Sequence, residues 1–392
     1  MDTRLTSAAT LPEDAERALL VGRAWVPAVD GAVLVAVRGD DLVDLSSIAP
    51  TSSALMNLRD PAQAIRKAGK LPRVASLAEA LANSAEGRRA SSQPWLMAPC
   101  DLQAIKAAGV TFVASMLERV IEEQARGDPA RAESVRRAIV AVIGDNLSSV
   151  RPGSAEAARL KDALIAQQAW SQYLEVGIGP DAEIFTKSQP MSAVGTGSEI
   201  GIHPKSEWNN PEPEIVLVAA SDGRTVGATL GNDVNLRDFE GRSALLLGKA
   251  KDNNASCAIG PFIRLFDADF TIDDVRSCEL AMRVEGPDGF VLDGTSSIAM
   301  ISRDPLDLVS QAIGPNHQYP DGFVLFLGTM FAPTKDRHGP GQGFTHVVGD
   351  VVTVSTPKLG ALVNRVNTSD RIAPWTYGAG ALMQSLARRK VL

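Results

Sequence analysis

Two spacings of apolar residues divide this chain. Between about 115 and 175, apolar residues recur three and four apart with acidic residues opposite them, as in Met116–Glu123, and this spacing predicts helices. From about residue 176 onward, short apolar runs separated by Gly, Pro, Asn and Asp predict strands joined by turns. The clearest of these runs are Ile215–Ala219, Ala228–Leu230, Phe323–Phe326 and Asp350–Ser355.

The segment before residue 95 has its own pattern. Gly31–Val37 and Leu42–Leu45 flank a turn containing Gly39, which predicts a β-hairpin. Short helices are expected around Ala54–Leu58 and Leu77–Leu81. Because Pro and Ser interrupt the pattern near residue 94, we expect a small N-terminal α+β domain over 1–95 and a second domain over 96–392.

Inside the second domain, a few further helices are expected. Gly127-Asp128-Pro129 should end the first helix of the 115–175 segment, and another should follow through Val135 and Ala141. Ser154 is a candidate cap for the next helix. In the β-rich region, Arg237–Lys249 is the strongest helix candidate.

Composition narrows the class of protein. With 392 residues, 45% hydrophobic and 22% charged, the chain is long enough for a large core. Its net charge of -7 argues against nucleic-acid binding. No apolar run reaches the roughly 18 residues of a membrane span, and the N-terminus lacks the apolar core of a signal peptide. Three separated cysteines favour reduced, buried thiols and a cytoplasmic location.

Three acidic residues are the main candidates for chemistry. Glu212 and Glu214 stand two apart at the entry to an apolar strand, so their side chains should project from the same side. Asp233 ends another apolar run. A cluster of carboxylates without Cys or His pairs suits Mg²⁺, Mn²⁺ or Ca²⁺ rather than zinc. The alternative interpretation of the two glutamates is a solvated edge pair.

Three further residues are candidates for a functional role only in combination with such a metal site. Lys251, in a polar segment entering an apolar turn, would act as acid or base beside a metal, and otherwise as a solvated loop lysine. Gly328 and Thr329 end a strand and would bind a carboxylate, although such threonines are commonly structural.

Several strings together resemble the fumarylacetoacetate hydrolase family. They are Glu212-Pro213-Glu214, Gly231–Asp238, Lys251, Gly260-Pro261, Gly328-Thr329 and Val348–Val352. The resemblance implies a mixed β-roll or incomplete barrel as catalytic domain, within an α+β chain. It also implies that Glu212, Glu214 and Asp233 bind a divalent metal, usually magnesium, and that Lys251 and Arg237 face the substrate. It implies a homodimer or homotetramer and no organic cofactor.

One departure from the family's pattern bears on the reaction. Family hydrolases carry a histidine and a glutamate that activate water, and Ser115 occupies the histidine position here. A serine hydroxyl is a much poorer base at neutral pH, so hydrolysis is the weaker interpretation. The segment Ser115–Arg119 is then expected to act as a lid over the substrate.

Longer strings, among them Trp208–Glu214 and Gln318–Gly322, resemble the sugar-acid dehydratase branch of that family. This implies conversion of 2-keto-3-deoxy-D-pentonate (xylonate or arabinonate) to 2,5-dioxopentanoate, with Glu183 as a second catalytic carboxylate. Thr329, Asn254 and Arg119 would contact the substrate. Three alternatives remain: a carbon–carbon hydrolase of an acylpyruvate or 2,4-diketo sugar acid, a decarboxylase, and a sugar-acid sensor without turnover.

Overall fold

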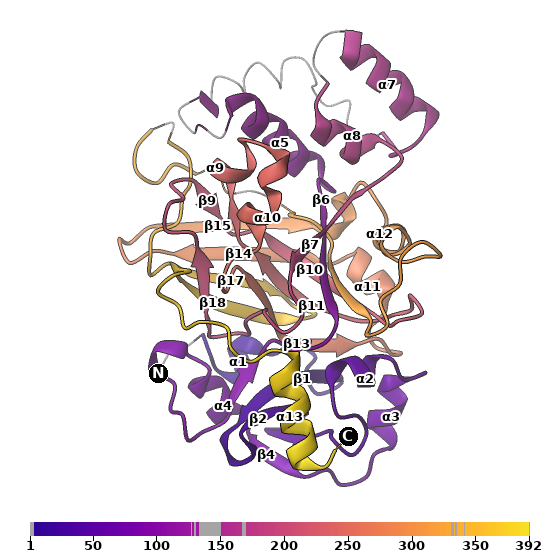
Figure 1. Ribbon diagram of the computed structural model, residues 1–392, viewed down its shortest axis with the longest axis vertical. Helices are drawn as coiled ribbons and strands as arrows, with labels where there is room; N and C mark the ends of the chain where they lie inside the picture. The colour runs from indigo at the N-terminus through magenta and orange to yellow at the C-terminus, as the bar shows by residue number, and fades with distance from the viewer. Residues whose placement is uncertain are drawn as a thin grey trace.

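Figure 1 presents a computed structural model of the chain. The structure describes residues 4–126, 128, 131–132, 150–166, 170–330, 333, 335–340 and 342–391, without the side chains of 113–115 and 122. The expected helix through Val135 and Ala141 lies outside the described residues.

A large, mostly antiparallel sheet forms the frame of the molecule. Within the described residues it has 11 strands, in the order β4-β3-β2-β1-β13-β11-β10-β16-β6-β7, with β5 paired to β1. Only β6 and β16 among these pairs run parallel. The strands are β1 Leu20–Val26, β2 Gly31–Arg38, β3 Asp41–Asp44, β4 Arg73–Ser76, β5 Trp95–Met97, β6 Ala104–Gly109, β7 Glu183–Ser188, β10 Pro213–Ala219, β11 Thr225–Asp233, β13 Cys257–Leu265 and β16 Phe323–Phe326.

A second sheet packs against the first through the main core. Its order is β15-β14-β17-β18-β8. Alternate residues of β10 point to opposite faces, and Ile215 and Leu217 join the core shared with this sheet whereas Val216 and Val218 join another buried cluster. Strand β10 is therefore buried on both faces. The strands are β8 Glu199–Ile202, β14 Glu279–Glu285, β15 Val291–Ser297, β17 Val351–Thr356 and β18 Gly360–Thr368, and β9 Asn209–Asn210 pairs separately with β12 Asn235–Leu236.

Helices cover two opposite ends of the molecule (Figure 1). One end, which carries both termini, has α1 Ser7–Thr10, α2 Ser52–Met56, α3 Pro61–Lys67, α4 Leu77–Asn83 and α13 Ala379–Arg389. The other end has α5 Val113–Ala125, α7 Ala155–Ala166 and α8 Gln172–Ile178, with α9 Arg237–Glu240 and α10 Leu247–Lys251 beneath them. The remaining α-helices of the described residues are α11 Ile272–Arg276 and α12 Pro305–Ala312.

The N-terminal segment is joined to the rest by backbone pairing. Strand β1 pairs with β13, with Leu20 opposite Arg264. The C-terminal helix α13 returns to this end, where Arg389 Nη1 donates to the Ala32 carbonyl at 3.0 Å. The large sheet thus runs across residue 95, and the division of the chain at that point stays a prediction.

Most predicted elements are present with shifted ends. The hairpin is β2–β3, and Gly39 has the positive φ of +57° that its turn requires. Ser154 caps α7, since its hydroxyl accepts from the Ala157 amide at 3.1 Å. The three cysteines are buried and unpaired.

The single helix predicted over Arg237–Lys249 is wrong. The chain forms α9, leaves the helix at Gly241, and resumes as η4 Ala244–Leu246 and α10. Ser243 is extended, and its hydroxyl accepts from the Leu245 amide, so a new helical start is stabilised in the middle of the expected one. Among the described helices, none combines the length and the apolarity needed to cross a bilayer.

Candidate active site

The three acidic residues predicted as ligands meet in the structure. Glu212, Glu214 and Asp233 each offer a carboxylate oxygen, these oxygens lie within 4.8 Å of one another, and all three residues are buried. The solvated edge pair is therefore wrong for the two glutamates. The prediction that both glutamates project from one side of the strand is confirmed.

Backbone pairing between β10 and β11 brings the carboxylates together. Glu214 stands opposite Gly231, and the Asp233 amide donates to the Glu212 carbonyl at 2.9 Å. Because β10 is buried on both faces, charged residues at its entry are carried into the interior rather than to the surface.

Gly328 and Thr329 hold one of these ligands. The Gly328 amide donates to Glu214 Oε2 at 2.7 Å and the Thr329 hydroxyl to Glu214 Oε1 at 3.3 Å. Gly328 has φ +103°, a conformation that favours glycine, and a Cβ there would lie 1.9 Å from Thr111 Oγ1. In this structure both predicted substrate-binding groups contact a carboxylate of the cluster.

Three cationic side chains surround the cluster. Lys251 Nζ lies 3.1 Å from Asp233 Oδ2 and also donates to Glu212. Lys187 Nζ lies 2.9 Å from Asp233 Oδ1. Arg119, on α5, pairs with Glu212 and with Glu240, the latter at 2.9 Å.

The charge balance of this region favours a divalent cation. Five carboxylates, those of Glu183, Glu212, Glu214, Asp233 and Glu240, meet three cations, Arg119, Lys187 and Lys251. When all eight groups are ionised, the net charge of this region is two negative charges, which one divalent cation would neutralise. Oxygen ligands alone suit Mg²⁺, Mn²⁺ or Ca²⁺.

Within this excess of negative charge, the pKa values of the clustered carboxyl groups shift in different directions. Burial together with the charges of Asp233 and Glu212 raises the pKa of Glu214 well above its usual range. Burial opposes ionisation of Glu212 too, but Arg119 and Lys251 lower its pKa to about 2. Burial also works against a charged Lys251, yet Asp233 and Glu212 raise its pKa. A cation among the three carboxylates would reduce the electrostatic repulsion that raises the pKa of Glu214. It would also reduce the attraction that raises the pKa of Lys251.

Glu183 begins β7 and is carried to the same cavity. It stands opposite Gly109 of β6, and a Cβ on Gly109 would lie 1.9 Å from Glu183 Oε2. Burial and the nearby Glu240 raise the pKa of Glu183 to about 7, against the opposite effect of Arg119 and Lys251. This carboxyl group is therefore partly protonated at neutral pH.

The cavity between these side chains is small. Its volume is about 20 Å³, close to the space of one water molecule. Helix α5 lies over this end of the sheet (Figure 1), and Arg119 reaches from it into the cavity. Entry of a molecule larger than water therefore requires movement of Arg119 or of α5. The lining residues are Ala108, Gly109, Val110, Arg119, Glu183, Phe185, Glu212, Glu214, Asp233, Glu240, Lys251 and Thr329.

Besides Gly328, two described residues predicted to contact substrate do not line this cavity. The Asn254 side-chain amide donates to three carbonyls of the C-terminal segment, those of Ser369, Ile372 and Ala373. It ties two segments together and is left out of the proposed site. Arg237 is buried, with Nε donating to Asn210 Oδ1 at 2.9 Å and its guanidinium over the Trp208 ring. The Ser115 side chain lies outside the described residues.

Sequence reasoning missed three residues here: Lys187, Glu240 and Phe185. A signal for Phe185 exists in the alternation of β7, where it shares a face with Glu183. Lys187 stands at an irregularity of the β6–β7 register, which the spacing does not announce. Glu240 follows Arg237 by three positions on the short helix α9, and nothing in that spacing distinguishes it from a solvated residue.

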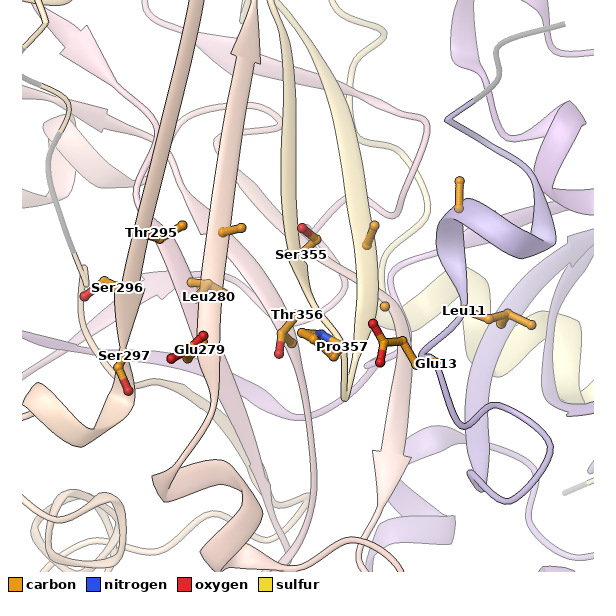
Figure 2. A pocket seen from close by; sticks show the side chains of 14 residues that line it. Leu11, Glu13, Glu279, Leu280, Thr295, Ser296, Ser297, Ser355, Thr356 and Pro357 are labelled. Carbon is orange, nitrogen blue, oxygen red and sulfur yellow. The ribbon is translucent and has the colours of Figure 1, made fainter.

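A larger groove lies elsewhere on the molecule. It has a volume of about 580 Å³ and runs between the N-terminal segment near Leu11 and the second sheet. Figure 2 shows Thr356 and Pro357 between Glu13 and Glu279 in this groove. None of the predicted site residues lines it, so size alone does not identify the site, and chemistry favours the small buried cavity.

Comparison with known proteins points in the same direction. Residues 161–367, more than half of the chain, match the model of the fumarylacetoacetate (FAA) hydrolase C-terminal domain. Over 196 residues the chain is 32% identical to a probable 2-keto-3-deoxyxylonate dehydratase of Haloferax volcanii, covering 50% of this chain and 64% of that protein. Over 190 residues it is 29% identical to 2-dehydro-3-deoxy-D-arabinonate dehydratase of Saccharolobus solfataricus, covering 48% and 60%. The chain thus spans less than two thirds of the length of these relatives.

The fold also has solved counterparts. One of them is the structure of 2-keto-3-deoxy-D-arabinonate dehydratase complexed with magnesium and 2,5-dioxopentanoate. It aligns with a TM-score of 0.60 and 20% identity over 89% of this chain and 99% of that one. At this identity the likeness establishes the fold alone, and it confirms the expected mixed β-roll of an α+β chain.

Proposed function

The chain belongs to the fumarylacetoacetate hydrolase family, and on that premise we propose that it is a metal-dependent dehydratase converting 2-keto-3-deoxy-D-pentonate to 2,5-dioxopentanoate and water. The observation that carries the proposal is the buried trio Glu212, Glu214 and Asp233 with Lys251 in contact. Two relatives are named as dehydratases of such acids, and a solved dehydratase with this fold is complexed with magnesium and 2,5-dioxopentanoate.

Glu212, Glu214 and Asp233 would hold a divalent cation, Mg²⁺ in the first instance, with Mn²⁺ or Ca²⁺ also compatible. When bound, that ion supplies Lewis acidity toward the ketone of a 2-keto acid. No organic cofactor is required, because no electrons are transferred to or from an external carrier.

Lys251 is the proposed acid–base group at carbon 3. Its ammonium is paired with Glu212 and Asp233, and it must give up a proton before it can act as a base. The neutral amine then removes a carbon-3 proton, and the electron pair of that C–H bond forms the double bond between carbons 3 and 4 as the carbon-4 hydroxyl leaves.

Glu183 is the proposed proton donor to the leaving hydroxyl. Its pKa, raised to about 7 by burial and Glu240, keeps a protonated fraction available at neutral pH. Hydroxide is a poor leaving group, so the proton must arrive as the carbon–oxygen bond breaks. A proton lost from carbon 5 is then replaced at carbon 3, and the carbon-5 hydroxyl proton is replaced at carbon 4, which turns the unsaturated alcohol into the aldehyde.

Arg119 is the proposed partner of the substrate carboxylate. Its guanidinium now bridges Glu212 and Glu240, and a planar guanidinium binds a carboxylate through two hydrogen bonds. If Glu212 turns to a cation, one side of Arg119 becomes available to substrate while Glu240 retains the other. Helix α5, which carries Arg119, would then close over the site and exclude water.

The test is a product assay. Purified protein with Mg²⁺ and 2-keto-3-deoxy-D-pentonate should yield 2,5-dioxopentanoate, detected with a coupled semialdehyde dehydrogenase, and Asp233→Asn should abolish the signal. Formation of pyruvate and glycolaldehyde instead would mean aldol cleavage and would reject dehydration.

A further inference from the structure

Strand β7 brings three side chains to the region of the site. Glu183 and Phe185 alternate along the strand and share one face. Lys187 follows at an irregularity of the β6–β7 register, and its side chain is fully buried beside Asp233. Glu183 and Phe185 line the cavity, and Lys251 Nζ lies 5.8 Å from the centre of the Phe185 ring. Lys187 is the third of these residues and has no role in the mechanism above.

Lys187 is a fully buried cation. Its side chain is 0% exposed, and Nζ lies 2.9 Å from Asp233 Oδ1, itself buried. Taking both charges out of water costs several kcal/mol per ion unless their pairing and hydrogen bonds are good. Any substitution that removes this ammonium leaves a buried carboxylate without that partner.

The same ammonium also binds the backbone of the acid–base lysine. Nζ of Lys187 donates to the Lys251 carbonyl, and Lys251 is the last residue of α10. The carbonyls at a helix C-terminus have no partners within the helix and carry partial negative charge, so a cation there is stabilising. The Ser256 hydroxyl donates to the same carbonyl at 2.7 Å.

These contacts place Lys187 between two functional groups. Asp233 directs Oδ1 to Lys187 and Oδ2 to Lys251, 3.1 Å away. One oxygen of the proposed ligand is thus held from outside the cavity, which orients the other toward it. Outer-shell partners of a metal ligand commonly fix its orientation; here the partner acts through an ion pair, because Asp233 Oδ1 accepts no hydrogen bond from the described residues.

We propose that Lys187 is a positioning residue of the site: it orients Asp233 as a cation ligand and holds the backbone of Lys251 at the end of α10. This inference rests on the proposed function. It differs from a purely structural role, because a structural lysine would affect folding without changing cation affinity or turnover in the folded protein.

The experiment compares Lys187→Met with Lys187→Arg. Chelator-stripped protein is titrated with Mn²⁺, free Mn²⁺ is read by electron paramagnetic resonance, and kcat and KM are then measured at saturating metal. Lys187→Met should weaken Mn²⁺ binding by about 10–100-fold, because the Asp233 carboxylate is no longer held at Oδ1 and can turn, and should lower kcat more than it raises KM. Lys187→Arg keeps the positive charge, and it should recover part of the Mn²⁺ affinity and part of kcat.

Lys106→Met is the matched control. Lys106 lies on the neighbouring strand β6 and donates to Thr186 Oγ1 at 2.9 Å, so its partner sits on the opposite face of β7 from Lys187. This variant removes the same charge and should leave Mn²⁺ affinity and kcat unchanged.

Ser256→Ala separates the two parts of the role, and it serves if Lys187→Met fails to fold. It removes a donor to the Lys251 carbonyl and a long contact from Lys187 Nζ, at 3.4 Å, but keeps the Lys187–Asp233 ion pair, so kcat should fall severalfold with Mn²⁺ affinity unchanged. An unchanged kcat would overturn the backbone part. If Lys187→Met, or Lys187→Gln where Lys187→Met does not fold, binds Mn²⁺ as tightly as the wild type or more tightly, the claim that Lys187 orients Asp233 is overturned. A wild-type protein that binds no Mn²⁺ would instead reject the proposed function.

Discussion

At the scale of the residue, two glutamates of the same cavity have very different pKa values, because their neighbours differ in charge. Glu183 and Glu212 are both carboxyl groups of one small cavity. Glu212 contacts Arg119 and Lys251, and its pKa falls to about 2, whereas burial and Glu240 raise that of Glu183 to about 7. In the proposed mechanism these separated pKa values suit two different tasks: Glu212 would stay ionised as a ligand, and Glu183 would keep a proton to donate.

Lys251→Ala should abolish turnover and leave cation binding intact. We expect kcat to fall by about 10²–10⁴-fold, the usual contribution of a general acid–base group, while calorimetry finds Mg²⁺ binding at least as tight as in the wild type, since Lys251 competes for Glu212 and Asp233. Lys249→Ala, an exposed lysine of the same helix, is the control and should be silent. Near-normal kcat in Lys251→Ala would remove its assigned role.

The activity should fall as the pH rises through neutrality. Glu183 must be protonated to donate, and burial with Glu240 raises its pKa to about 7, so the donor form is complete well below pH 7 and is lost above it. The profile of kcat/KM against pH should therefore have a descending limb near pH 7. In Glu183→Gln, with much lower activity, that limb should be missing; its persistence would assign the limb to another group.

At the scale of the element, adjacent strands β6 and β7 depend on a glycine at their shared end. Gly109 is not among the described residues with a positive φ, so its requirement is space alone. The Glu183 carboxylate occupies the volume that a Cβ would need.

Gly109→Ala should therefore damage function more than stability. The clash is with the far end of a flexible side chain, 1.9 Å from the added carbon, so the chain folds by moving Glu183 aside. Displacing a catalytic group by about 1 Å can cost about 10²-fold in rate, and we expect kcat to fall on that order with a nearly unchanged melting temperature. Gly69→Ala, where nothing lies within 4 Å of the added carbon, is the control. Equal kcat values for the two variants would contradict the placement of Glu183.

At the scale of the whole molecule, the local sequence pattern predicts which side chains share a face, whereas tertiary packing decides which of them are buried. The strands and the carboxylate trio could be predicted, because period-2 alternation decides which side chains share a face. The break inside Arg237–Lys249 and the burial of Lys187 could not. A lysine near the end of a strand is ordinarily solvated, and only the packing of α10 against β7 buries this one.

The same limit applies to Asn254. Its position three residues after Lys251 suggested a substrate contact, but its partners are carbonyls more than a hundred residues away along the chain. Long-range contacts of this kind leave no trace in local spacing. The family resemblance implied that Glu212, Glu214 and Asp233 form one site, and the structure confirms that these side chains meet; their role as metal ligands stays a prediction.

Anomalous scattering from a crystal grown with Mn²⁺ tests the central claim most directly. The account predicts one strong peak within about 2.0–2.3 Å of carboxylate oxygens of Glu212, Glu214 and Asp233, a bonding distance for hard divalent cations, with Lys251 Nζ displaced from Glu212. A map with no peak among these three side chains, in a crystal whose Mn²⁺ concentration saturates activity, would contradict it.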